Sequence, residues 1–126
     1  MGDLSRNFSR KEFACKCGCG FDTVDAELIN VMQMNVRDRF GKILVPSGCR
    51  CYTHNIKSGG SKSSQHLKGK ACDFIATEHD MEYIYDYLCN KFPDKFGIGA
   101  YIDKEENTVR IHFDVRSACA RWTKPI

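Results

Sequence analysis

The sequence predicts one α+β domain over residues 1–126, with an antiparallel sheet and helices packed on one side of it. Three observations carry this prediction. Residues 28–40 place apolar side chains at helical spacing, residues 108–116 alternate apolar and polar side chains as a strand does, and 126 residues suit a single domain. Hydrophobic content of 42% and charged content of 28% are typical of a globular chain rather than a disordered one.

Local signals place the helices. Ser9 and Glu12 have capping-box spacing and open a short helical turn. Asp25 is the expected N-cap of a longer helix that ends at Gly41, with an apolar stripe formed by Leu28, Ile29, Met32, Val36 and Phe40. A further helix is expected over 81–91, and residues 54–63 are expected to form a polar loop.

Four strands are expected, at residues 43–45, 72–76, 98–102 and 108–116. Pro46 interrupts the first of them. Residues 103–107 have turn composition, so the last two strands are predicted to form an antiparallel hairpin. Trp122 is expected to be a packing residue near the end of the chain.

Two histidines and one aspartate are the candidate metal ligands. Asp73 lies within the apolar segment 72–76, where a carboxylate is costly to bury unless it is paired or binds a metal. His66 precedes it by seven residues, and Gly69 between them allows the chain to turn. His112 lies on the polar face of the strand 108–116. The three together would leave the fourth position of zinc open to water, as catalytic sites do, although other divalent ions also accept such ligands.

The motif from Ser64 to Asp73, Ser-x-His-x-x-Gly-x-Ala-x-Asp, followed by a later His, resembles the signature of the zinc D-Ala-D-Ala carboxypeptidases. Further segments resemble the branch of that family common in bacteriophages and cell-wall enzymes, in order and spacing: residues 7–13, 46–50, 54–55, 97–101 and 120–122. The resemblance covers nearly the whole chain. It implies the fold shared with the hedgehog signalling domain, and a zinc peptidase that hydrolyses peptidoglycan stem peptides by metal-activated water, as a D-Ala-D-Ala carboxypeptidase or as an endopeptidase (endolysin).

The resemblance also implies roles for Arg50 and Ser64. Arg50 would lie near the metal, contact substrate and stabilise the oxyanion formed by attack on the peptide bond; the alternative is a structural salt bridge. Ser64 would hydrogen-bond substrate or orient the site; the alternative is a plain turn residue.

The general base is where this chain departs from the family. Much of the family has an acid three residues before the second His, and Val109 stands there. Asp114 is the substitute that the sequence offers, because it shares the strand face of His112. Its alternative role is to orient a ligand or Arg116. Glu105 and Glu106 are expected to be solvated charges.

Eight cysteines raise the question of a second metal. Cys15, Cys17 and Cys19, joined by Cys49 or Cys51, would supply ligands for a structural zinc ion. Their alternate spacing lacks the gap usual in zinc knuckles, so reduced packing cysteines are the expectation.

Three functions are weighed. The leading one is the peptidase. The second is a non-catalytic zinc-bearing module at the wall or in a virion. The third, a cysteine-zinc adaptor for nucleic acid, is disfavoured by the net charge of only +3 and the single tryptophan.

Peptidoglycan peptides are the expected partner, with no nucleic acid and no membrane; the sequence makes no prediction of oligomeric state. The first residues lack an apolar signal-peptide core. Synthesis in the cytoplasm and action at the bacterial wall, as a phage or prophage product, are therefore expected, and a chain trimmed of its leader is the alternative.

Overall fold

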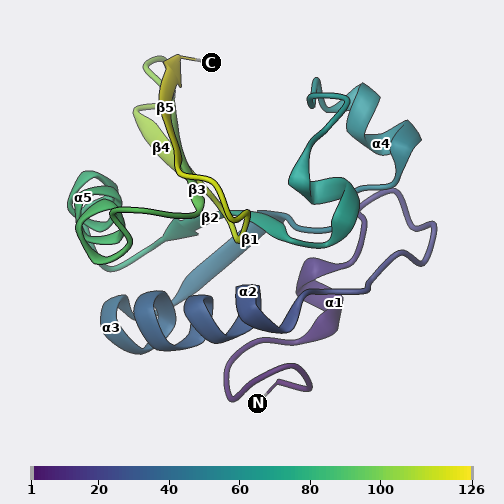
Figure 1. Cartoon of the computed structure of the whole chain (residues 1–126), viewed down its shortest axis with the longest axis horizontal. Helices are drawn as coiled ribbons and strands as arrows, with labels where there is room; N and C mark the ends of the chain where they lie inside the picture. Colours follow the sequence, from purple (N-terminus) through teal and green to yellow (C-terminus); the bar gives the residue numbers. More distant parts are fainter. Residues whose placement is uncertain (1, 126) are drawn as a thin grey trace.

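The computed structural model describes residues 2–125 and shows helices gathered around one sheet (Figure 1). The helical elements are α1 (Arg10–Phe13), α2 (Ala26–Val31), the π-helical η1 (Met32–Arg37), α3 (Asp38–Phe40), α4 (Tyr52–Lys57), the 3-10 helix η2 (Gln65–Lys68) and α5 (Met81–Lys91). The strands are β1 (Ile43–Ser47), β2 (Ala71–Ala76), β3 (Gly97–Asp103), β4 (Thr108–Asp114) and β5 (Ala120–Pro125). The predicted α+β class is confirmed.

The five strands form one sheet in the order β1-β2-β4-β3-β5. The pairs β1/β2, β2/β4 and β3/β4 are antiparallel, so the predicted hairpin of the last two expected strands is confirmed. Strand β5 pairs parallel to β3 and makes the sheet mixed. This terminal strand was not predicted, because Trp122 was expected there only as a packing residue.

The core lies on one face of the sheet. Segments α2, η1 and α3 follow one another as a continuous coil along the bottom of Figure 1, and α5 lies at its left. Their apolar side chains form a single cluster with alternate residues of the sheet, including Leu28, Met32, Phe40, Phe74, Ile84, Leu88, Ile111 and Phe113. Because side chains alternate along a strand, the residues between these sheet positions point to the opposite face. That face is therefore left for polar groups.

The predicted caps are present. Ser9 and Glu12 form the capping box of α1, and the Asp25 side chain accepts from the backbone N–H groups of Glu27 and Leu28. Gly41 follows α3 with a φ of 85°, a left-handed value that favours glycine.

Two local expectations were wrong. Pro46 lies inside β1 rather than ending it, because β1 is an edge strand and its register shifts between Leu44 and Ser47. Residues 54–57 of the expected polar loop belong to α4, where the Cys51 side chain accepts from the backbone N–H of His54. Within residues 2–125, no helix is long and apolar enough to cross a membrane.

Candidate functional site

The three predicted ligands come together on the polar face of the sheet. Asp73 on β2 and His112 on β4 are register partners, so adjacent strands place them side by side. His66 reaches them from η2, whose start is capped by the Ser64 hydroxyl accepting from the His66 backbone N–H at 3.2 Å. Gly69 ends η2 with a φ of 68°, which turns the chain into β2. Ser64 therefore caps the turn that carries His66, and it also lines the pocket described below.

His66 has a fixed tautomer. Its Nδ1 lies 2.6 Å from the carbonyl oxygen of Gly48, which can only accept, so the proton is on Nδ1. The Nε2 lone pair is buried and has no hydrogen-bond partner among residues 2–125. It lies 3.3 Å from Asp73 Oδ1, so an acceptor faces an acceptor unless a cation lies between them. An unpartnered buried imidazole nitrogen of this kind is typical of a metal ligand.

His112 is oriented in the same sense by Asp114. Its Nε2 lies 2.7 Å from Asp114 Oδ2 and its Nδ1 lies 3.1 Å from Asp73 Oδ1. With the Nε2–H donated to Asp114, the Nδ1 lone pair faces the same Asp73 oxygen as His66 does. A carboxylate behind a ligating imidazole is the usual support of histidine ligands.

The donor set fits zinc. Zinc bonds of roughly 2.0–2.1 Å to nitrogen and oxygen place tetrahedral ligand atoms about 3.4 Å apart. The separations of 3.3 Å and 3.1 Å from Asp73 Oδ1 to the two imidazoles are close to that value. Burial raises the pKa of Asp73, but the close approach of His112 and His66 outweighs it and holds the pKa well below its usual value, so the carboxylate is ionised. Two neutral imidazoles and one carboxylate remain as ligands.

The geometry favours the positioning role of Asp114 over that of a general base. Its side chain is fully buried, and both of its oxygens are engaged: Oδ1 accepts from the backbone N–H groups of Gly97 and Arg116, and the Arg116 guanidinium donates to both oxygens. It contacts the His112 nitrogen that points away from Asp73. These contacts leave it no path to a water molecule on the metal side of the ring.

Arg50 is held by three partners at the edge of the site. Its Nε donates to Ser47 Oγ at 2.9 Å, one terminal nitrogen donates to Asn55 Oδ1 at 3.3 Å, and the other donates to Asp73 Oδ2 at 3.1 Å. A guanidinium has five N–H groups, so two remain for a ligand. The salt bridge with Asp73 and a role toward substrate are therefore compatible.

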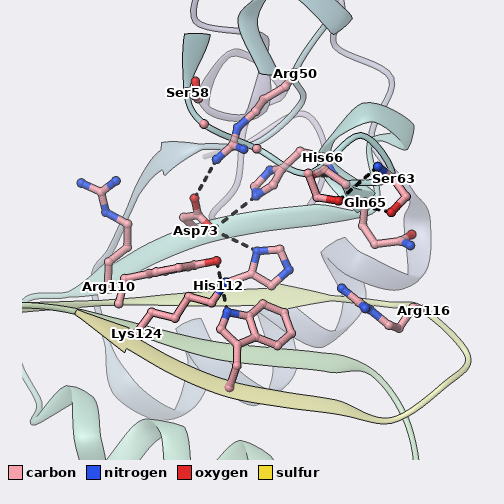
Figure 2. Close-up of a pocket in the computed structure, with 16 residues that line it drawn as sticks. Arg50, Ser58, Ser63, Gln65, His66, Asp73, Arg110, His112, Arg116 and Lys124 are labelled. Atoms are coloured by element: carbon pink, nitrogen blue, oxygen red, sulfur yellow. Dashed lines mark hydrogen bonds and ion pairs between the residues drawn. The ribbon is translucent and has the colours of Figure 1, made fainter. Parts of the chain in front are cut away.

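A cavity of about 540 Å³ opens over these residues (Figure 2). Four cations line it: Arg50, Arg110, Arg116 and Lys124. Small polar residues of the segment 58–64 form one wall, and Tyr101 and Trp122 contribute aromatic surface. The Trp122 indole donates to the Tyr101 hydroxyl at 3.1 Å and packs 5.0 Å from the His112 ring, centroid to centroid. The pocket is strongly cationic, which suits a substrate that carries carboxylates.

Of the pocket-lining residues in the described part of the chain, Asp73 alone carries a carboxylate. Val109 points to the other face of the sheet, where it lines a separate cavity beside α5. Glu105 and Glu106 are exposed on the β3–β4 turn, as expected. None of these residues supplies a base at the metal.

Sequence reasoning missed Trp122 and Lys124 as pocket residues. Both lie on β5, and residues 121–124 show no alternation of apolar and polar side chains that would have indicated a strand there. Arg110 and Arg116 are separated from His112 by even numbers of residues, so alternation along this segment puts them on the same face, and both line the pocket.

A second group of possible metal ligands lies outside this pocket. Cys15, Cys17, Cys19 and Cys51 gather with their sulfur atoms within 4.8 Å of one another. The expectation of packing cysteines was wrong for Cys17 and Cys19, because both are exposed. Cys49, the other candidate, is buried, and its thiol points to the carbonyl of Thr23.

Comparison with known families agrees with the geometry. The family described as peptidase M15 matches residues 6–112, a range that includes His66, Asp73 and His112. The comparison with curated proteins gave no match. A match over most of the chain, together with a buried His-Asp-His group able to hold the zinc on which this family depends, identifies the chain as a member of the peptidase M15 family of zinc metallopeptidases.

Proposed function

We propose that this chain hydrolyses peptide bonds in the stem peptides of bacterial peptidoglycan, as a D-Ala-D-Ala carboxypeptidase or as an endopeptidase. The observation that carries the proposal is the convergence of three lone pairs, from His66, Asp73 and His112, at the floor of a cationic pocket. On this proposal the protein acts at the bacterial wall, as a phage or prophage product.

The charge of the pocket supports a peptide substrate with free carboxylates. A chain ending in D-alanine carries one at the position next to the scissile bond of a carboxypeptidase. Arg110, Arg116 and Lys124 offer cations on the strand side of the cavity, where a single bound peptide could meet them. Arg116 is itself paired with Asp114, so Arg110 and Lys124 are the freer of the three.

The chain supplies both binding and electrostatic stabilisation. His66, Asp73 and His112 would hold zinc, which lowers the pKa of a bound water molecule and polarises a carbonyl. Arg50, fixed by Ser47, Asn55 and Asp73, keeps two N–H donors for the oxygen on which negative charge develops. Because the guanidinium is already fixed, it need not reorganise during the reaction.

One observation favours a second function. Asp73 is the sole carboxylate among the described residues that line the pocket, and it is committed to the metal. A zinc-bearing module that binds wall peptides without cutting them would have this composition, since it needs the cations and no proton acceptor.

The test is to incubate the purified zinc-loaded protein with bacterial peptidoglycan, with and without a chelator, and to identify released fragments by mass spectrometry. The matched variants are His66→Ala and His79→Ala; His79 is exposed and lies outside the pocket. We expect release that is lost with the chelator and in His66→Ala and kept in His79→Ala, and the new termini name the bond. Binding without release supports the module. Release that survives His66→Ala contradicts both functions.

A further inference from the structure

The loop after α1 and the start of α4 meet through four cysteines. Cys15, Cys17 and Cys19 lie on the loop, and Cys51 directly precedes α4. In Figure 1 this loop runs at the right of the view, below α4. The four sulfur atoms lie within 4.8 Å of one another, and all four thiols are free.

The sulfur separations are those of a metal–thiolate centre. A zinc–sulfur bond of about 2.3 Å places the sulfur atoms of a tetrahedral site about 3.8 Å apart. Cys17 Sγ lies 3.4 Å from Cys15 Sγ and 3.6 Å from Cys51 Sγ. A disulfide requires about 2.05 Å, so these pairs are too far apart to be bonded and closer than unrelated thiols need be.

The backbone is shaped for this convergence. Gly18 and Gly20 have φ values of 84° and 94°, a left-handed conformation that folds the loop so that three alternate cysteines face one centre. Backbone N–H groups point at two of the sulfurs: that of Cys51 donates to Cys15 Sγ and that of His54 donates to Cys51 Sγ, each at 3.4 Å. Such donors stabilise thiolate charge.

We propose that Cys15, Cys17, Cys19 and Cys51 bind a second, structural zinc ion, separate from the site at His66. The four thiols lose their protons on binding, and no position is left open for water, which makes the centre structural rather than catalytic. The position of this centre indicates its structural role. It ties the N-terminal loop to the segment Cys49–Cys51 that carries Arg50, and so it holds the residue that reaches Asp73.

Metal content tests the proposal without any measurement of hydrolysis. Protein purified with zinc and a reductant is analysed by inductively coupled plasma mass spectrometry. We expect about two zinc ions per chain in the unaltered protein and about one in Cys17→Ser/Cys19→Ser. Both replaced side chains are exposed, so the change leaves no cavity in the core. Cys119→Ser, an exposed cysteine outside the cluster, is the control and should keep about two.

The His66→Ala variant separates the two sites. It should keep the cysteine-bound zinc, and its cobalt-substituted form should still show thiolate-to-cobalt charge transfer that disappears in Cys17→Ser/Cys19→Ser. Zinc content unaffected by the double serine variant overturns the proposal. So does a disulfide between two of these four thiols, located by peptide mapping of the protein under native conditions. A wall peptidase that fails to cut while carrying both ions would refute the proposed function and leave this site standing.

Discussion

Asp114→Asn is the change that most directly tests how the metal centre is built. Asp114 Oδ2 accepts from His112 Nε2 and from Arg116, and Oδ1 accepts from Gly97 and Arg116. An amide has one acceptor and one donor end, so either orientation turns an NH2 group against donors that the carboxylate accepted. The buried site then favours the other tautomer of His112, with its proton on the nitrogen that faces Asp73.

The expected cost is a weaker metal site. Loss of a carboxylate behind a ligating histidine typically reduces metal affinity by roughly 10- to 100-fold, about 1.4 to 2.8 kcal/mol. The high end applies here, because Asp114 is fully buried and no water can replace it. Zinc affinity is measured by competition with a chromophoric chelator, with Asp94→Asn, an exposed carboxylate, as the control.

The same variant distinguishes positioning from proton transfer. A positioning residue lowers zinc affinity, and activity returns when excess zinc saturates the site. A general base leaves zinc affinity unchanged and lowers kcat at saturating zinc. Unchanged affinity with a collapse of kcat would refute the role that the structure favours for Asp114.

Three further changes test the surrounding structure. Arg50→Lys replaces the planar guanidinium that reaches both Asp73 and the pocket with a single ammonium group, so we expect kcat for a stem peptide to fall roughly 100-fold. An effect on KM alone would contradict the electrostatic role. Gly99→Ala would place a Cβ 2.2 Å from the Trp122 ring, so we expect a loss of about 1–3 kcal/mol of stability in urea titration, and an unchanged midpoint would contradict the packing of Trp122 on β3. Hydrogen bonds from Gln33 and Arg6 lower the pKa of Asp38 below its ordinary value of 3.8, so the carboxylate adds stability above that value and loses it as the pH falls through the lowered pKa. The difference in unfolding free energy between the unaltered protein and Asp38→Asn, measured over a pH series, should be constant near neutrality and shrink in acid; a difference that does not change with pH would contradict this account.

The part of the site that sequence reasoning placed well depends on local rules. His112 follows from the period of two in its strand, and Asp73 follows from the cost of burying a carboxylate in an apolar segment unless it is paired or binds a metal. The helix at 81–91 follows from its own apolar stripe, and the structure has the same bounds. Each of these signals is contained within about ten consecutive residues.

The rest depended on contacts between distant segments. Trp122 joins the pocket only because β5 pairs with β3, more than twenty residues earlier in the chain. Its short strand has no stripe of buried residues that would have predicted a strand there. The role of Asp114 depends on which imidazole nitrogen it contacts, which spacing does not specify. Cys51 meets Cys17 across 34 residues, so no knuckle-like spacing marks the cluster.

The pairing of Asp73 with His112 across β2 and β4 also makes metal binding a check on strand alignment. A slip of one residue between these strands would turn one ligand into the apolar core and leave the other without its partner. Misaligned chains would therefore be unable to bind zinc, whereas correctly aligned chains would gain a stability that rises with the logarithm of the free zinc concentration once it exceeds the dissociation constant. Folding in the presence of zinc should then select the aligned form, and the yield of native protein after refolding would depend on the metal even before any substrate is met.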